Sequence, residues 1–351
     1  MASYIDKAML ARHAGLAEKH AYIVNARTAN WHLENNLFEQ SGRIQANDAR
    51  MPDSVWRDFD TSVKEVMTGD EGGSLLADLQ PLARSVDVGK IISEYRKFSD
   101  AEMEVRTSVD GQHAKPVNNS SYEFDGVLLP VHSTQVARNW RELAGMRSAG
   151  YDALIDDQAD AARFVRRRTV DNFVNGTADL QFKGAKALGI VTNPNTIKLD
   201  LGAGGLNTDL SAAATDFAAV QKVFIAIVQR IQGSGNNAVG NITVYVSNEI
   251  WFNLMRTANP AASTTESMLT ALLRTPGIAA IKQTDTLTGN ALFGMILSRQ
   301  YVQPVFGMPV TTTPIARVTP MDDWHVLVWS ISGLQIKADA AGRSGVLYAA
   351  G

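Results

Sequence analysis

Apolar residues in the first 80 positions recur at helical spacing, but only in short and narrow stripes. Ile5, Met9 and Leu16 belong to one stripe, and residues 52–54 (Pro-Asp-Ser) have the chemistry of a helix start. Helices with such narrow apolar faces are marginal without tertiary contacts. We therefore expect residues 1–80 to form an N-terminal helical arm that lies on another surface.

The next stretch, residues 86–137, changes to an extended and mostly polar pattern. Two runs with strand-type composition, VDVGKIISEYRKFSDAEMEVRTSV and YEFDGVLLPVHSTQVARN, flank the turn-forming segment DGQHAKPVNNSS. This order predicts a long hairpin. Because its strands have little apolar surface to bury, the hairpin needs another surface to support it.

From Gly150 onward, the sequence YDALIDDQADAARFVRRRTVDNFVNG carries an apolar stripe at helical spacing. The stripe predicts one helix of about 25 residues, ended by Asn175 and Gly176. Aspartates lie in its first half and arginines in its second, which is the order that the helix dipole favours. The expected stripe consists of residues 151, 154, 155, 162, 165 and 173, completed by Thr169.

The same helix carries three consecutive arginines, Arg166, Arg167 and Arg168. They spread over about 200° of the helix circumference, so at most two of them share a face. Three interpretations stay open at this point: a solvated helix face, ion pairing with another subunit, or contact with nucleic acid.

The remainder of the chain, about 185–351, has the strongest apolar patterns. DLSAAATDFAAVQKVFIAIVQRIQGSG predicts an amphipathic helix, NITVYVS a buried strand, and NEIWFNLMRTA and TESMLTALLRT two further helices. Two long strand-rich runs follow. This pattern predicts the α+β class, with a mixed sheet that holds most of the core.

Composition narrows the function. The 351 residues carry a formal net charge of −3, which argues against a broad grip on DNA by phosphate neutralisation. The chain has no cysteine, which excludes disulfides, thiol catalysis and cysteine-based metal sites. No run approaches the roughly 18 apolar residues that span a bilayer, so we expect no membrane partner.

No catalytic or cofactor motif is found. None of the six histidines has the spacing of a zinc motif, and GAGG at 202–205 lacks the pattern of a phosphate or dinucleotide loop. No nucleophile elbow occurs. We therefore expect no enzyme activity, no cofactor and no metal ion.

The order of the segments, with two short motifs, resembles the major capsid protein of tailed bacteriophages, which has the Hong Kong 97-type fold also used by encapsulin shells. The resemblance is carried by GVLLPVHSTQVARNWRELAGMRSAGYDALIDDQADAARFVRRRTVDNFVNG and by GIVTNPN. In that family a long helix typically ends at F-x-N-G, followed shortly by G-[IL]-x-N. Here the first is residues 173–176, and the second is residues 189–193 (GIVTN), which have one residue more between the isoleucine and the asparagine than the pattern.

The resemblance implies a division of the chain into named parts. These are an N-terminal arm (1–80), the first part of a peripheral domain (81–194) with an extended loop (about 100–127) and a spine helix (about 149–175), an axial domain (195–320), and closing strands of both domains (321–351).

The function implied by the resemblance is a shell protein that self-assembles through hexamers and pentamers into an icosahedral virion capsid. Its implied partners are packaged double-stranded DNA on the inner face, bound without sequence specificity, and scaffolding, portal and decoration proteins, with assembly in the host cytoplasm. An encapsulin-like compartment that encloses a cargo enzyme is the alternative, which the long arm disfavours. An unrelated enzyme, with a site built from distant residues, is the third hypothesis.

The resemblance also places the candidate contacts between subunits. Arginines of the spine helix are expected to meet carboxylates on a neighbour's hairpin, because the planar guanidinium binds a carboxylate in two places. The acceptors expected there are Glu102, Glu104 and Glu123.

Some members of the family join their subunits by an isopeptide bond between a lysine near the loop tip and an asparagine late in the chain. Lys115 stands at the tip and could be the donor. However, Asn290 is the last asparagine of the sequence. We therefore expect a shell without covalent cross-links.

Overall fold

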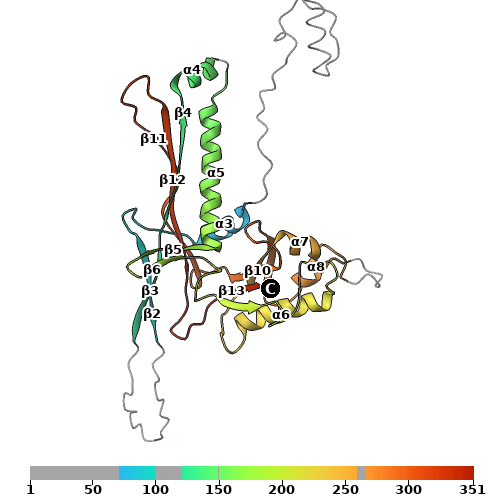
Figure 1. Cartoon of the computed structure of the whole chain (residues 1–351). Coiled ribbons are helices and arrows are strands. Elements are labelled where there is room, and N and C mark those ends of the chain that lie inside the picture. The colour runs from blue at the N-terminus through green and yellow to red at the C-terminus, as the bar shows by residue number, and fades with distance from the viewer. Residues whose placement is uncertain (1–70, 100–108, 110–120, 149, 259–265) are drawn as a thin grey trace, which may run out of the picture. The chain divides into compact units, whose positions relative to one another are not determined.

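The computed structural model describes residues 71–99, 109, 121–148, 150–258 and 266–351, which form two larger and two smaller sheets with helices (Figure 1). All of these residues belong to one compact unit, Thr68–Gly351. Their mixture of helices and sheets confirms the predicted α+β class.

The five-stranded sheet has the order β7-β13-β10-β8-β9. Its outer pairs, β7 with β13 and β8 with β9, are parallel, whereas β10 is antiparallel to both of its neighbours. The predicted mixed sheet is therefore present. Its strands are β7 (Ile197–Asp200), β8 (Ile242–Val246), β9 (Ile278–Gln283), β10 (Ala291–Ile296) and β13 (Val346–Ala350).

Three helices pack with this sheet: α6 (Phe217–Gln232), α7 (Asn248–Leu254) and α8 (Met268–Leu273). Each begins at a residue whose side chain accepts a hydrogen bond from a backbone N–H of the first turn, namely Asp216, Ser247 and Ser267. Helix α6 buries a stripe at helical spacing, and each large aliphatic or aromatic side chain so buried contributes about 1.5–3 kcal/mol. The stripe consists of Val220, Val223, Phe224, Ile227 and Ile231.

The four-stranded sheet has the order β1-β11-β12-β4 and supports the long helix α5 (Ala153–Val174). Strands β11 and β12 are antiparallel, as are β12 and β4. Figure 1 shows α5 running beside these strands, with α4 (Trp140–Ser148) before its first turn. The strands are β1 (Arg84–Ser85), β4 (Val131–Arg138), β11 (Val302–Ile315) and β12 (Trp324–Ile336).

Helix α5 begins at Asp152, whose side chain accepts from the Leu154 N–H. It faces the sheet with Leu154, Val165 and Thr169, which are buried. The Thr169 hydroxyl donates to the Val165 carbonyl at 3.0 Å and lies 3.1 Å from the Ser330 hydroxyl of β12. The expected stripe was wrong at its first turn, where Tyr151 and Ile155 are exposed.

The end of α5 is held by the second of the two resemblance motifs. The amide N–H groups of Ile190 and Val191 donate to the carbonyls of residues 173 and 174, at 2.9 and 2.8 Å, and the Thr192 hydroxyl donates to the carbonyl of residue 175 at 3.1 Å. Carbonyls that a helix C-terminus leaves without partners are thus satisfied. Gly176 has φ 74°, and a Cβ there would collide with the backbone nitrogen of Gly189. We call this arrangement the clasp.

Between the two halves of the clasp, the chain makes a small hairpin of β5 (Gly176–Phe182) and β6 (Ala185–Leu188). Its turn residues, Lys183 and Gly184, have φ values of 48° and 87°. Positive φ at both central residues is typical of the tightest hairpin connections.

The larger hairpin consists of β2 (Ile92–Phe98) and β3 (Tyr122–Leu128), antiparallel, with Ile92 opposite Leu128. Its tip lies outside the described residues. The predicted hairpin over 86–137 is too long at its end, because β4 leaves it and pairs with β12 instead.

Two expected boundaries differ from the structure. Helix α3 (Gly73–Leu79), which is followed by a short 3₁₀ turn at Gln80–Leu82, lies within the range expected for the arm. It buries Leu75 and Leu79 against the end of α5, so it belongs to the folded unit. Residues 302–315, expected in the axial domain, form β11 of the sheet that carries α5.

Candidate assembly site

The root of the β2–β3 hairpin is a polar network centred on Asp125. The Tyr95 hydroxyl donates to the Asp125 carboxylate at 3.0 Å, and the Asn195 amide donates to the same oxygen at 2.9 Å. The Asn195 amide also reaches the Ile336 carbonyl at 3.1 Å, and the Ala338 N–H donates to the Tyr95 hydroxyl at 2.9 Å. We call this set the hairpin root.

A charge completes the network. The Lys97 ammonium lies 2.6 Å from the Asp125 carboxylate, and little of the lysine side chain is exposed. Burial raises the pKa of Asp125, but the hydrogen bonds from Lys97 and Asn195 and the charge of Lys97 outweigh it, so its pKa lies below the usual range. Burial, reinforced by the Asp125 carboxylate, raises the pKa of Tyr95. At neutral pH the network therefore holds an ionised aspartate and a neutral tyrosine.

The hairpin root joins segments that are far apart in the sequence. Tyr95 and Asp125 come from the two strands of the hairpin, Asn195 from the loop after the clasp, and Ile336 from the end of β12. Because hydrogen bonds are directional, a network of this kind fixes the direction in which the hairpin leaves the body. No sequence motif signals it, since the residues meet only in the fold.

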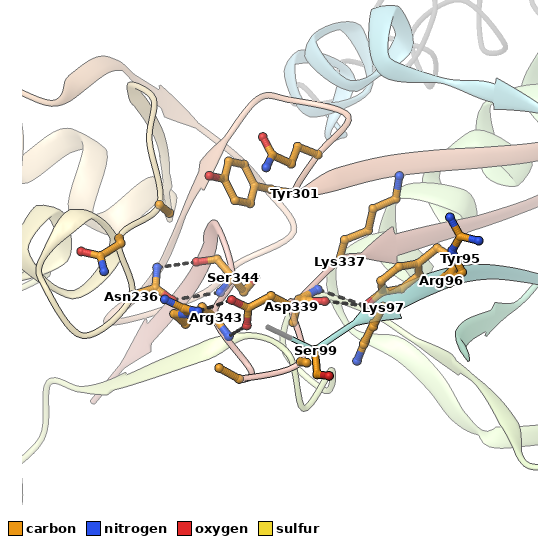
Figure 2. A pocket seen from close by; sticks show the side chains of 16 residues that line it. Tyr95, Arg96, Lys97, Ser99, Asn236, Tyr301, Lys337, Asp339, Arg343 and Ser344 are labelled. Carbon is orange, nitrogen blue, oxygen red and sulfur yellow. Dashed lines mark hydrogen bonds and ion pairs between the residues drawn. The ribbon is translucent and has the colours of Figure 1, made fainter. Parts of the chain in front are cut away.

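Beside the hairpin root lies a cleft of about 820 Å³, whose lining is mostly uncharged but has more basic than acidic side chains (Figure 2). Its charged side chains are those of Arg96, Lys97, Lys337, Arg343 and Asp339. The Arg343 guanidinium lies 2.7 Å from the Asp339 carboxylate.

The Lys337 ammonium is bonded within the protein. It donates to the Arg299 carbonyl at 2.9 Å and to the Gln303 side chain at 2.7 Å. Burial, together with the charge of Arg84, lowers its pKa. These contacts make Lys337 a structural residue of the cleft wall.

The exposed face of the hairpin is aromatic. Tyr122 and Phe124, two residues apart on β3, are 60% and 70% exposed, and the Arg96 guanidinium lies 4.9 Å from the centre of the Tyr122 ring. Large apolar side chains on a protruding surface are typical of protein interfaces. In the sequence, these two aromatic residues alternate with polar ones in a strand, which indicates an exposed aromatic face. Our sequence analysis did not use this signal.

The predicted arginines lie on the surface of α5. Arg166, Arg167 and Arg168 are all exposed. Arg168 pairs with Asp171 of the same helix and lies 3.5 Å from the Thr177 hydroxyl. In the described ranges, neither Arg166 nor Arg167 forms an ion pair within its chain.

The predicted acceptors are only partly described. Glu123 is exposed on β3, opposite Lys97 in the strand register, and it forms no ion pair with the three arginines. Glu102, Glu104 and Lys115 lie outside the described residues. The expected contacts between subunits therefore stay predictions.

In the described part of the chain, no group of three or more histidine, aspartate or glutamate side chains could hold a metal ion. Among the same residues, no helix combines the length and the apolar character required to cross a membrane.

A model of a family of unknown function (DUF6260) matches residues 45–349. No curated protein matches the sequence.

Solved structures share the fold at low sequence identity. The capsid of Myoviridae phage XM1 is 12% identical with a TM-score of 0.66, covering 86% of this chain and 98% of that one. The capsid of the native GTA particle is 12% identical with a TM-score of 0.54, covering 87% and 99%. A structure from Microbacterium phage Oxtober96 is 14% identical with a TM-score of 0.54, covering 84% and 95%. These likenesses identify the Hong Kong 97-type fold.

Proposed function

Because the chain belongs to the family of unknown function DUF6260 and has the Hong Kong 97-type fold, we propose that it is a structural protein that assembles into the capsid of a tailed bacteriophage. The observation that carries the proposal is the match to the phage XM1 capsid over 86% of this chain and 98% of that one. The shell would consist of hexamers and pentamers of this chain and would enclose a double-stranded DNA genome. The protein would be part of the virion.

The parts of the chain take the following roles in this proposal. The residues before Thr68 are the arm, the β2–β3 hairpin is the base of the extended loop, and α5 with the four-stranded sheet is the peripheral domain. The five-stranded sheet with its helices is the axial domain. The hairpin root then sets the angle at which the extended loop reaches a neighbouring subunit.

Two features of the described residues support a role in assembly. The aromatic face of the hairpin, with Tyr122 and Phe124, is not covered by the other described residues. The turn between β11 and β12 also exposes apolar side chains, with Val318 at 94%. A closed shell supplies partners for such surfaces, because each subunit repeats the same contacts around symmetry axes.

The proposal also includes contacts of the chain with the packaged genome and of the α5 arginines with a neighbouring subunit. With a net charge of −3, the chain would contact DNA weakly and without sequence specificity. Arg166 is available for a carboxylate on a neighbour's hairpin, such as Glu123. Scaffolding, portal and decoration proteins are further proposed partners, and assembly takes place in the host cytoplasm.

The test is to produce the chain and to image what sediments as large particles. We expect closed shells in which the β2–β3 hairpin lies over a neighbouring subunit. A protein that stays monomeric at high concentration, with and without its neighbouring gene products, would overturn the proposal. DNA inside native particles supports the capsid, whereas an enclosed enzyme would instead identify an encapsulin-like compartment.

A further inference from the structure

The face of α5 directed away from the sheet carries a charged stripe. Its members are Asp156, Asp160, Arg163 and Arg167, spaced by 4, 3 and 4 residues. At 100° per residue these four side chains lie within about 60° of the helix circumference. Beyond Arg167 the same stripe continues with Val170, which is buried. The charged part is therefore a bounded surface of two acidic and then two basic residues.

The charged groups of this stripe are incompletely paired by the residues that the structure describes. Asp156 and Arg167, at its two ends, are exposed and have no ion pair among the described residues. Arg163 pairs with Asp160 at 3.3 Å and lies over the Phe164 ring, but its Nε atom is buried without a hydrogen-bond partner. The exposed charges of Asp156 and Arg167 are the groups of the stripe that a partner beyond the described residues can reach.

The charges of the stripe are complementary to those of the same stripe on a second α5 helix that runs in the opposite direction. Positions 156 and 167, and positions 160 and 163, lie symmetrically about the midpoint between residues 161 and 162. In an antiparallel pair of α5 helices related by a two-fold axis at that point, every aspartate faces an arginine of the other copy. A parallel pair in register would place like charges against each other.

We propose that α5 packs antiparallel against α5 of a second copy of this chain across a two-fold axis, with Asp156 facing the second copy's Arg167 and Asp160 facing its Arg163. The inference rests on the proposed function, because an icosahedral shell necessarily contains two-fold axes. In a two-fold contact each residue pair occurs twice, so the stripe forms four ion pairs. The antiparallel arrangement also places the helix dipoles favourably.

The three consecutive arginines then have different partners. Arg167 belongs to the two-fold contact, and Arg168 is taken by Asp171 of its own helix. Arg166, which lies about 100° from Arg167, points away from the stripe. Duplex DNA is a poor occupant of the same stripe, because Asp156 and Asp160 repel phosphate.

The test is a charge exchange between the two ends of the stripe. D156R and R167D are made singly and together, and the lowest protein concentration that gives particles is measured at low salt. Each single change places like charges across the axis, and we expect it to raise that concentration at least about fivefold. The double variant restores opposite charges, and we expect it to assemble within about twofold of the parent.

Recovery in the double variant is specific to contact between copies. Within one helix the two positions are about 16 Å apart, which exceeds the Debye length of about 8 Å at physiological salt. R166D is the control: it has the same charge change on the same helix but a different face, and adding D156R should give it no recovery. Circular dichroism and melting temperatures confirm that each variant folds.

A second measurement does not depend on shell formation. The natural chain has no cysteine, so Asp160→Cys carries a single thiol. A short bismaleimide should join two copies of this variant but not two copies of Arg166→Cys. No recovery in the double variant, or equal cross-linking of the two cysteine variants, overturns the α5 pairing. Loss of particles and DNA content in both R166D and R167D, without recovery, would assign the stripe to nucleic acid instead.

Failure of the proposed function gives a different result. If the parent protein forms no particles under any condition, the capsid proposal falls, and the cysteine variants alone decide whether α5 pairs with a second copy.

Discussion

Removing the charge of Asp125 tests the hairpin root directly. Asp125→Asn keeps the shape of the side chain but loses the ion pair with Lys97 and places an amide donor among the donors of Lys97 and Asn195. Hydrogen bonds to charged groups contribute about 1.5–3 kcal/mol each, and the 35% exposure of the Asp125 side chain reduces that figure. We expect the free energy of unfolding to fall by about 2–3 kcal/mol at pH 7.

The assay is urea unfolding of the unassembled subunit, followed by circular dichroism. Asp179→Asn is the matched control, because Asp179 is an exposed carboxylate on β5 that forms no hydrogen bond or ion pair with another described side chain. Its replacement should change the free energy of unfolding by less than about 0.5 kcal/mol. Replacing Lys97 by Met in the D125N background should recover part of the loss, since it removes the unpaired charge.

The same variant has a defined pH dependence. The pKa of Asp125 is lowered in the folded protein, so its stabilising effect is complete above the unfolded pKa of about 3.9 and is lost as the pH falls through the folded value. The difference between parent and D125N should therefore be constant from pH 5 to 8 and shrink below about pH 4. Equal unfolding energies for D125N and D179N at pH 7, or a difference that persists unchanged in acid, would refute the reasoning.

Three further predictions concern the clasp, the arm and covalent links. Gly176→Ala should lower the free energy of unfolding by about 2–4 kcal/mol, because residue 176 has a positive φ and its new Cβ would collide with the backbone of the clasp. Gly184→Ala, which has open space around it, should lower the same free energy by about 1 kcal/mol. Chemical denaturation compares the two variants. Deletion of residues 1–67 should leave a folded subunit that assembles poorly, whereas deletion of residues 1–80 also removes α3 and its two buried leucines and should abolish cooperative melting. Boiled particles should run as a single band near 38 kDa on a denaturing gel, and a ladder of multimers would show that Lys115 or another residue forms cross-links.

Elements with a long regular period could be predicted from the sequence. Helix α5 and helix α6 have apolar stripes of several turns, and both are found where the stripes lie. The hairpin was predicted from strand composition on either side of a turn-rich segment, but its second strand ends at Leu128. The exit of the chain into β4 depends on pairing with β12, which lies nearly 200 residues later.

The features that could not be predicted from the sequence depend on contacts between residues that are far apart in the chain. Strand β11 has no pattern that separates it from the five-stranded sheet, and only its pairing with β12 assigns it to the sheet under α5. Helix α3 has 7 residues, too few for a periodic signal, yet Leu75 and Leu79 are fully buried. The hairpin root joins Tyr95, Asp125 and Asn195, three residues of ordinary type that carry no motif.

The β5–β6 hairpin begins and ends at the clasp, so the chain enters and leaves the hairpin at the same place in the fold. Hydrogen bonds between residues 173–175 and 190–192 close the chain across its base, whatever length of chain lies between them. The turn at Lys183 and Gly184 is exposed, and a Cβ at Gly184 would meet no atom within 4 Å. Extra sequence inserted there adds only the slowly growing entropy of a longer loop. The fold thus contains a position where a foreign peptide can be inserted, and in the proposed shell this position would be repeated once on every subunit.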